Sequence, residues 1–117
     1  HYLIADRAGH SVLVEFYQGE RVVIPKDATW HLATNFLRAS AGENPEGRCW
    51  RYDTLRQRLE MTKGHMTVLE AIDLLDEVSQ EGTQWSIVDE LNKGDVNVVM
   101  GRQYDTVHAL SADDISE

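Results

Sequence analysis

The order of hydrophobic patterns along the chain restricts its fold more than any other feature. Helical periodicity is confined to the middle of the chain, and strand-like alternation lies on both sides of it. Helices and strands segregated in this way are typical of α+β proteins. We therefore expect an α+β fold in which two helices pack on one face of an antiparallel sheet. At 117 residues, the chain is expected to form a single domain over 1–117.

The clearest predicted element is a helix that begins at Thr67. The stretch Thr67-Val68-Leu69-Glu70 has the form of a capping box, in which Thr is followed three residues later by Glu. One apolar stripe then follows at helical spacing: Val68, Ala71, Ile72, Leu75 and Val78. An earlier helix is expected after Arg48–Arg51, ending at Lys63-Gly64-His65, and its apolar residues are Tyr52, Leu55 and Leu59.

Strands are predicted where apolar residues alternate with polar ones between turn residues. The expected strands are Tyr2–Ala5, Ser11–Tyr17, Arg21–Ile24, Trp30–Thr34, Trp85–Leu91, Val96–Met100 and Val107–Leu110. The first four of these are expected to form an antiparallel meander, with a hairpin turn at Gln18-Gly19-Glu20. The acidic end, Ser111–Glu117, is expected to fray.

Charge and cysteine content exclude several classes of partner. The net charge of −9 argues against a surface for nucleic acid or anionic membrane, which needs clustered Lys and Arg. No apolar run approaches the roughly 20 residues of a membrane helix. The single cysteine, Cys49, excludes an internal disulfide and a cysteine-based metal cluster. We therefore expect neither nucleic acid nor membrane as a partner. A single cysteine does not identify the cellular compartment, and we favour the cytoplasm.

Neither the histidines nor the carboxylates have the spacing of a known site. No two of the five histidines are four residues apart, and exposed loop residues are the better interpretation: His1, His10, His31, His65 and His108. Glu15 and the other carboxylates are read mostly as a solvated face. We accordingly expect no metal and no cofactor.

Three residues remain candidates for chemistry. Cys49 is either a nucleophile activated by nearby arginines or a small buried residue at a helix start, and the second reading is favoured. Asn35, at the end of a predicted strand in the stretch ATNF, is a turn residue, a polar group buried in the core, or a donor to an oxyanion. Arg51 is either a surface residue or a group that holds an anion or thiolate. On the residues alone, the turn and surface readings are the commoner ones.

Four stretches of the chain resemble a known enzyme family, in the family's own order. They are HYLIADRAGHSVLVEF, LATNF, CWRYDTLRQRL and TQWSIVDELNKGDVNVVMGRQYDTVHAL. They are similar to motifs of the N-terminal-nucleophile hydrolases that cleave linear amide C–N bonds. This group includes choloylglycine hydrolases, penicillin V acylases and acyltransferases that act on penicillin precursors.

The resemblance implies an αββα sandwich, of which this chain is the C-terminal half. It also implies that an N-terminal Cys attacks an amide carbonyl and uses its own α-amine as the base. By the same resemblance, Asn35 helps to build the oxyanion hole and Arg51 helps to order the nucleophile. Arg48 is the less favoured alternative for the arginine.

The chain departs from this family at its first residue. Residue 1 is His, and Cys49 lies inside the chain without a free α-amine. We therefore expect the C-terminal part of a larger amidohydrolase or acyltransferase, inactive alone, whose substrate is a small-molecule amide. Bile salts, penicillins and N-acyl amino acids all fit this chemistry. We also expect self-association through the surface left by the missing half. The alternative is a non-catalytic ligand-binding or interaction domain of similar topology.

Overall fold

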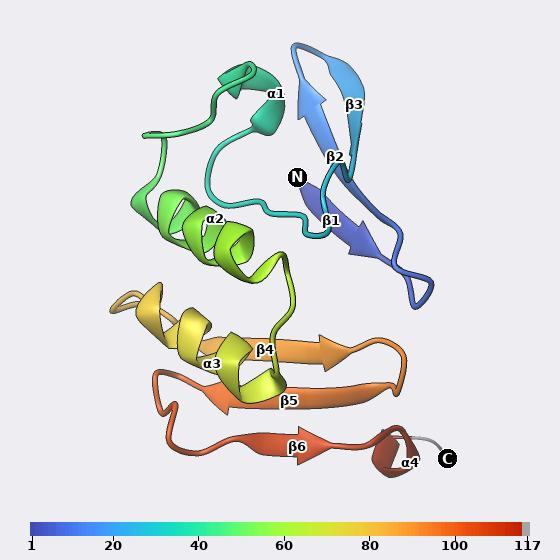
Figure 1. Cartoon of the computed structure of the whole chain (residues 1–117), viewed down its shortest axis with the longest axis vertical. Coiled ribbons are helices and arrows are strands. Elements are labelled where there is room, and N and C mark those ends of the chain that lie inside the picture. Colours follow the sequence, from blue (N-terminus) through green and yellow to red (C-terminus); the bar gives the residue numbers. More distant parts are fainter. Residues whose placement is uncertain (116–117) are drawn as a thin grey trace. The chain divides into compact units, whose positions relative to one another are not determined.

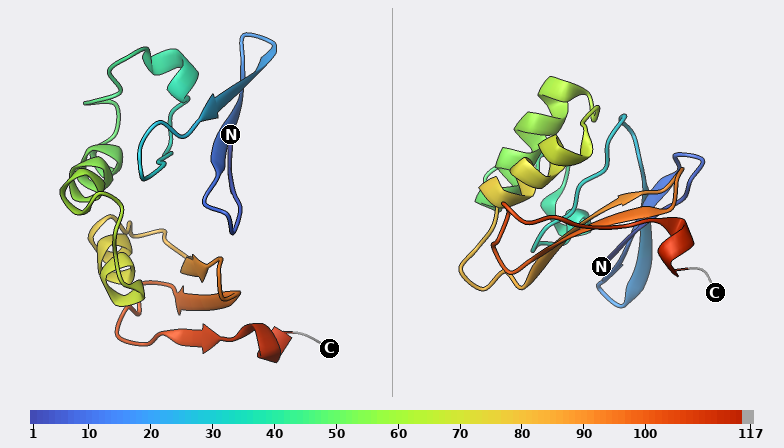
Figure 2. Two further views of the ribbon diagram at one scale, coloured as in Figure 1. Left: turned by 45° about the vertical axis from the view of Figure 1, so that its right-hand side comes forward. Right: turned by 90° about the horizontal axis from the view of Figure 1, so that it is seen from below.

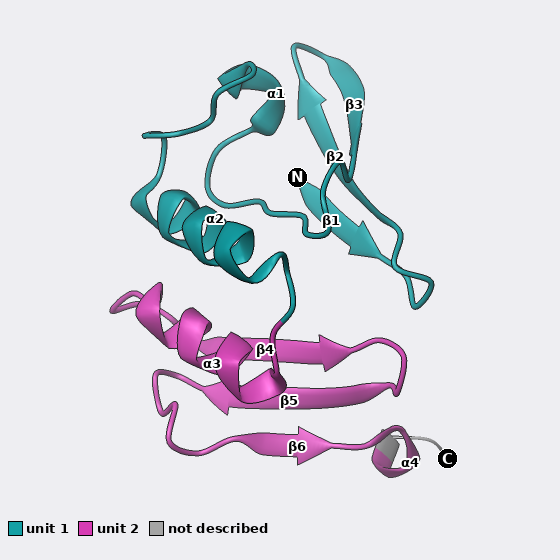
Figure 3. Ribbon diagram, viewed as in Figure 1, with its two compact units in different colours: residues 1–65 teal, residues 66–117 magenta. Residues whose placement is uncertain are grey.

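The computed structural model describes residues 1–115, and it has the α+β class that the sequence predicts (Figure 1). Its strands are all antiparallel, and they form two three-stranded sheets where the sequence suggested one. The chain divides into two compact units, His1–His65 and Met66–Glu117 (Figure 3). The single domain over 1–117 stays a prediction.

The first sheet is a meander in the order β1-β2-β3. Its strands are β1 (Tyr2–Ala5), β2 (Ser11–Tyr17) and β3 (Glu20–Pro25). Gln18 and Gly19 both have positive φ, 52° and 79°, between β2 and β3. Two such residues form a turn whose twist matches the flanking strands, so the predicted hairpin is confirmed.

The two faces of this sheet differ in burial. Leu13 and Glu15, which point to the same side of β2, are both fully buried. On the other side, Val14 is paired with Tyr2 and with Val23, and the side chains of Tyr2 and Val23 are exposed. The sheet therefore buries one face and leaves an apolar face open.

The predicted strand Trp30–Thr34 is wrong, because these residues form irregular structure after β3. The segment is held by side chains instead of a strand ladder: the His31 Nδ1 atom lies 2.8 Å from the Ser11 hydroxyl. Leu32 is buried and lines the same pocket as Tyr52. Alternation of apolar residues therefore reflects burial against a helix here, and not strand pairing.

Two helices complete the first unit. The short helix α1 (Arg38–Ala41) was not predicted, and α2 (Trp50–Thr62) was. At the end of α2, Lys63 and Gly64 both adopt positive φ, 55° and 77°, and the Gly64 N–H donates to the Leu59 carbonyl at 3.0 Å. A Cβ on Gly64 would lie 2.7 Å from the Thr29 carbonyl oxygen. Glycine is thus required both by the backbone conformation and by the close approach of the chain.

In the second unit, α3 (Val68–Glu77) begins as the sequence predicts. The Thr67 hydroxyl accepts a hydrogen bond from the Glu70 N–H at 3.2 Å. The helix and its C-cap bury three side chains: Ile72, Leu74 and Val78. Leu74 was not part of the predicted apolar stripe. The helix packs against the second sheet, as the views in Figure 2 show.

The second sheet has the order β4-β5-β6, with β4 (Trp85–Glu90), β5 (Asp95–Met100) and β6 (His108–Leu110). Val99 of β5 is fully buried. The side chains that alternate with it belong to the opposite face, where several large apolar residues are exposed: Trp85, Ile87, Met100 and Leu110. Like the first sheet, this one has an open apolar face.

The acidic end is more ordered than predicted. Residues Ala112–Ile115 form the short helix α4, and the Asp114 carboxylate accepts hydrogen bonds from the N–H and hydroxyl of Ser111. Residues 116 and 117 of the stretch expected to fray lie outside the described residues. Over residues 1–115, no helix has the length and apolar character needed to cross a bilayer.

Candidate functional site

Two segments that are distant in sequence meet at the start of α2. The Thr34 hydroxyl lies beside the Cys49 thiol, and the Phe36 and Tyr52 rings meet edge to face with centroids 5.0 Å apart. Asn35 lies between Thr34 and Phe36, and Arg51 lies between Cys49 and Tyr52. These two side-chain contacts join the segment that contains Asn35 to the helix turn that contains Arg51.

Asn35 is exposed and lies in a bend, so it does not end a strand as predicted. Within residues 1–115, its side-chain amide forms no hydrogen bond. It is therefore not a buried polar group satisfied by the core. Its two N–H donors are free to bind an external acceptor.

Arg51 lies in the first turn of α2 and is half-buried. Its guanidinium makes no ion pair within the described part of the chain, and its positive charge lowers the pKa of Cys49. Arg48, in contrast, is exposed and extends toward the Ser40 carbonyl, at 3.5 Å. Of these two arginines, Arg51 is the one whose charge acts on the Cys49 thiol.

Cys49 is the half-buried N-cap residue of α2. Burial raises the pKa of its thiol, but the Tyr52 N–H, the Thr34 hydroxyl and the N–H and charge of Arg51 together bring the pKa below its usual value. A helix start favours a thiolate for the same reason, because its backbone N–H groups lack intrahelical partners. The net effect on the thiol is a lowered pKa, at a residue that the sequence analysis favoured as small and buried.

Glu15 is a structural residue that the sequence analysis placed on a solvated face, which is wrong. Its carboxylate is fully buried and accepts hydrogen bonds from the backbone N–H groups of Arg38 and Ala39, both at 2.8 Å. The His1 Nδ1 atom lies 3.5 Å from the same carboxylate. Glu15 therefore fixes the chain just after Asn35. Its two-residue spacing from Leu13 was the one signal of burial in the sequence.

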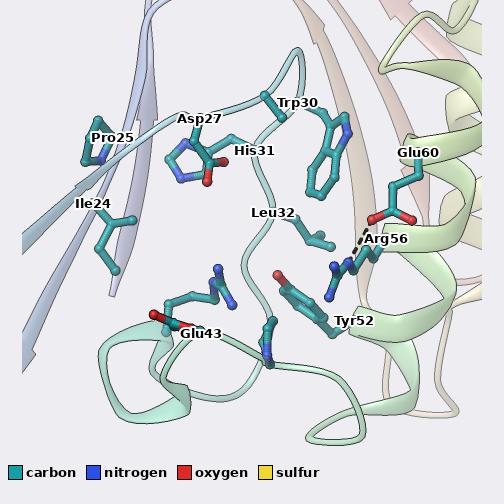
Figure 4. A pocket seen from close by; sticks show the side chains of 13 residues that line it. Ile24, Pro25, Asp27, Trp30, His31, Leu32, Glu43, Tyr52, Arg56 and Glu60 are labelled. Carbon is teal, nitrogen blue, oxygen red and sulfur yellow. Dashed lines mark hydrogen bonds and ion pairs between the residues drawn. The ribbon is translucent and has the colours of Figure 1, made fainter.

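A pocket of about 300 Å³ lies in the first unit, between the β3 end, the segment after it and α2 (Figure 4). Its apolar lining includes Leu32, Trp30 and Tyr52, and its charged lining includes Arg38 and Arg56. Arg56 is paired with Glu60 at 2.9 Å, the interaction drawn in Figure 4. Neither Asn35 nor Arg51 lines the pocket. The predicted site residues and the pocket are therefore separate features, and sequence motifs gave no sign of the pocket.

The environment of the pocket sets the charge of two lining residues. Burial lowers the pKa of His31, and the charges of Arg38 and Lys26 lower it further against the opposing effect of Asp27. Burial raises the pKa of Tyr52, so its hydroxyl stays protonated at neutral pH. His31 is accordingly a neutral imidazole, and Tyr52 is a neutral hydrogen-bond donor.

Within 1–115, no three His, Cys, Asp or Glu side chains lie together as a group that could hold a metal ion. The chemistry that the candidate site residues offer is that of the Asn35 amide, the Arg51 guanidinium and the Cys49 thiol. Comparison with known proteins returned no family model, no curated protein and no solved structure that matches this chain.

Proposed function

We propose that this chain is the C-terminal half of an αββα N-terminal-nucleophile hydrolase or acyltransferase that acts on linear amides. The observation that carries the proposal is that the Asn35 amide has no acceptor within 1–115 and that its neighbour Phe36 contacts Tyr52, the residue after Arg51. A donor without an intramolecular acceptor is suited to a developing oxyanion.

In the proposed reaction, the N-terminal Cys of the complete enzyme attacks the amide carbonyl, and its α-amine accepts the thiol proton. The carbonyl oxygen becomes negatively charged in the tetrahedral intermediate. The Asn35 N–H donates a hydrogen bond to this oxygen. Arg51 positions the nucleophile and its surroundings through its fork of donors.

The open faces of the two sheets also support the proposal. Exposed apolar side chains lie on the face of the first sheet opposite Leu13 and on the face of the second sheet opposite Val99: Tyr2, Ile4, Phe16, Val23, Trp85, Ile87, Met100 and Leu110. A sandwich fold needs sheets of this kind, with helices on one face and apolar residues on the other.

The test uses the full-length protein that carries this chain, assayed against N-acyl amino acids, conjugated bile salts and penicillins. Replacing Asn35 with Ala should lower kcat by about 100- to 1,000-fold and change KM little, as loss of an oxyanion donor does. The control is Asn92→Ala, in the exposed turn between β4 and β5. Normal turnover by the Asn35 variant would remove Asn35 from the mechanism.

A non-catalytic ligand-binding role is the second candidate, and one observation favours it. The pocket in the first unit contains neither Asn35 nor Arg51, so it does not depend on a catalytic centre. A full-length protein that binds a ligand tightly, turns over no linear amide and lacks a processed N-terminal Cys would support this role over the first.

A further inference from the structure

The guanidinium of Arg38 has no acceptor in the first unit. Its Nη1 atom is buried without a hydrogen-bond partner, and none of its side-chain nitrogens donates to another residue within 1–115. Its side chain lies over the ring of Tyr52, whose centroid is 5.5 Å from Cζ, and its charge acts on His31. A half-buried cation without an acceptor is costly, so an anion bound at the pocket would stabilise Arg38.

The other charged groups of the pocket leave this position open. Arg56 is already bound by Glu60, and His31 is neutral. Asp27 and Glu43 also line the pocket, but both are exposed, and neither forms an ion pair with Arg38. Their charges are in contact with water, where screening limits repulsion of an incoming anion.

We propose that this pocket binds a small carboxylate ligand with an apolar body, and that the carboxylate is held by Arg38. The guanidinium fork matches the two oxygens of a carboxylate. Figure 4 shows the Tyr52 hydroxyl directed into the pocket, where it is a second donor, and the apolar body lies against Trp30 and Leu32. The volume of about 300 Å³ suits a ligand of roughly ten heavy atoms. This site is independent of Asn35 and holds whether or not the chain belongs to a hydrolase.

The test compares 3-phenylpropionate with its neutral analogue, 3-phenylpropionamide, by titration into the 15N-labelled chain. The carboxylate should shift the Trp30 indole N–H and the amides of His31 and Leu32, and the amide analogue should bind at least about tenfold more weakly, since it cannot form a charge-assisted pair. Equal affinity for the two compounds, or shifts confined to residues outside the pocket, would overturn the proposal.

Variants assign the carboxylate contact to one residue. Arg38→Gln should weaken binding at least about tenfold, and Arg38→Lys should retain part of the affinity because it keeps the charge. Arg56→Gln should change the affinity by less than about threefold, because Arg56 is already paired with Glu60. Arg51→Gln, outside the pocket, should have no effect.

Two results among these variants contradict the proposal. One is unchanged binding by Arg38→Gln, and the other is loss of binding by Arg51→Gln, which would place the ligand at the start of α2. If Arg38→Gln does not fold, two other measurements test the proposal. Arg38→Lys must bind the carboxylate more weakly than the unmodified chain, and the unmodified chain must show a shift at Trp30.

Discussion

At the residue scale, His31 connects the irregular segment after β3 to the first sheet. Its Nδ1 atom contacts the Ser11 hydroxyl, and its ring lines the pocket near Arg38. Burial is the largest influence on this imidazole, and the nearby cations act in the same direction. The folded protein therefore resists protonation of His31, whereas the unfolded chain does not.

This difference makes stability depend on pH. The pKa of His31 is lower in the folded state than the ordinary value of 6.5, so the unfolded chain binds more protons as the pH falls below that value. The stabilisation is complete above pH 6.5 and is lost progressively down to the folded pKa. His31→Gln should therefore lose less stability than the unmodified chain when the pH falls from 7.5 to 5.5, as measured by the urea midpoint.

The control for this measurement is His108→Gln, since His108 is exposed. A constant difference in urea midpoint between His31→Gln and the unmodified chain, at all pH values, would reflect only the lost contact with Ser11. It would mean that His31 does not cause the loss of stability at low pH.

The sequence identifies residues with free donors better than residues whose charge is buried. Asn35 and Arg51 stay predictions as site residues, but the structure gives Asn35 an amide without an acceptor and Arg51 a guanidinium without an ion pair within 1–115. Glu15 and Arg38 were missed because a buried charge is determined by partners distant in sequence: the Glu15 carboxylate binds N–H groups 23 and 24 residues away. Their roles arise only when the chain has folded.

At the scale of elements, the end of α2 is fixed from two directions. Lys63 and Gly64 turn the chain through the left-handed region, and the Thr29 hydroxyl donates a hydrogen bond to the Lys63 carbonyl. The segment after β3 thus approaches the helix end so closely that the Thr29 carbonyl excludes a side chain at Gly64.

Gly64→Ala should lower the free energy of unfolding by at least about 2 kcal/mol, because the new Cβ meets both the positive φ and the Thr29 backbone. The matched control is Gly82→Ala, since Gly82 does not have positive φ and has open space around it. That variant should change stability by no more than about 1 kcal/mol. Urea titration followed by circular dichroism measures both, and equal stability of the two variants would contradict this account of Gly64.

Helix boundaries were the most predictable part of the fold, because their signals are local. The Thr67 cap and the Lys63-Gly64 end were read correctly from a few neighbouring residues. The strand expected at Trp30–Thr34 was wrong, because alternation cannot distinguish pairing with a strand from burial against a helix. The helix α1 was missed since its cap, Glu15, lies in another element.

At the scale of the whole molecule, each compact unit has its own sheet with one open apolar face. The predicted half-sandwich stays a prediction, and the sequence did not indicate that the strands divide into two sheets. The division depends on which strands pair, and all the strand segments share similar apolar alternation.

Open apolar faces of this kind lead us to expect that the chain self-associates. Sedimentation should show an average mass that rises with protein concentration, and Ile87→Lys should reduce that rise, because a charge in the open face of the second sheet opposes burial. The control is Leu69→Lys, since Leu69 is 66% exposed and belongs to α3 instead of the sheet. A single monomeric species at high concentration, or equal effects of the two variants, would contradict this prediction.

The capping of α1 by Glu15 has a consequence for the order in which the chain folds. A four-residue helix does not persist by itself, because the first turn costs more entropy than its hydrogen bonds return. The N–H groups at its start acquire an acceptor only when β2 has closed a loop of more than twenty residues onto it. We therefore expect the segment of Asn35, two residues before Leu37 at the start of α1, to become ordered no earlier than its contact with β2.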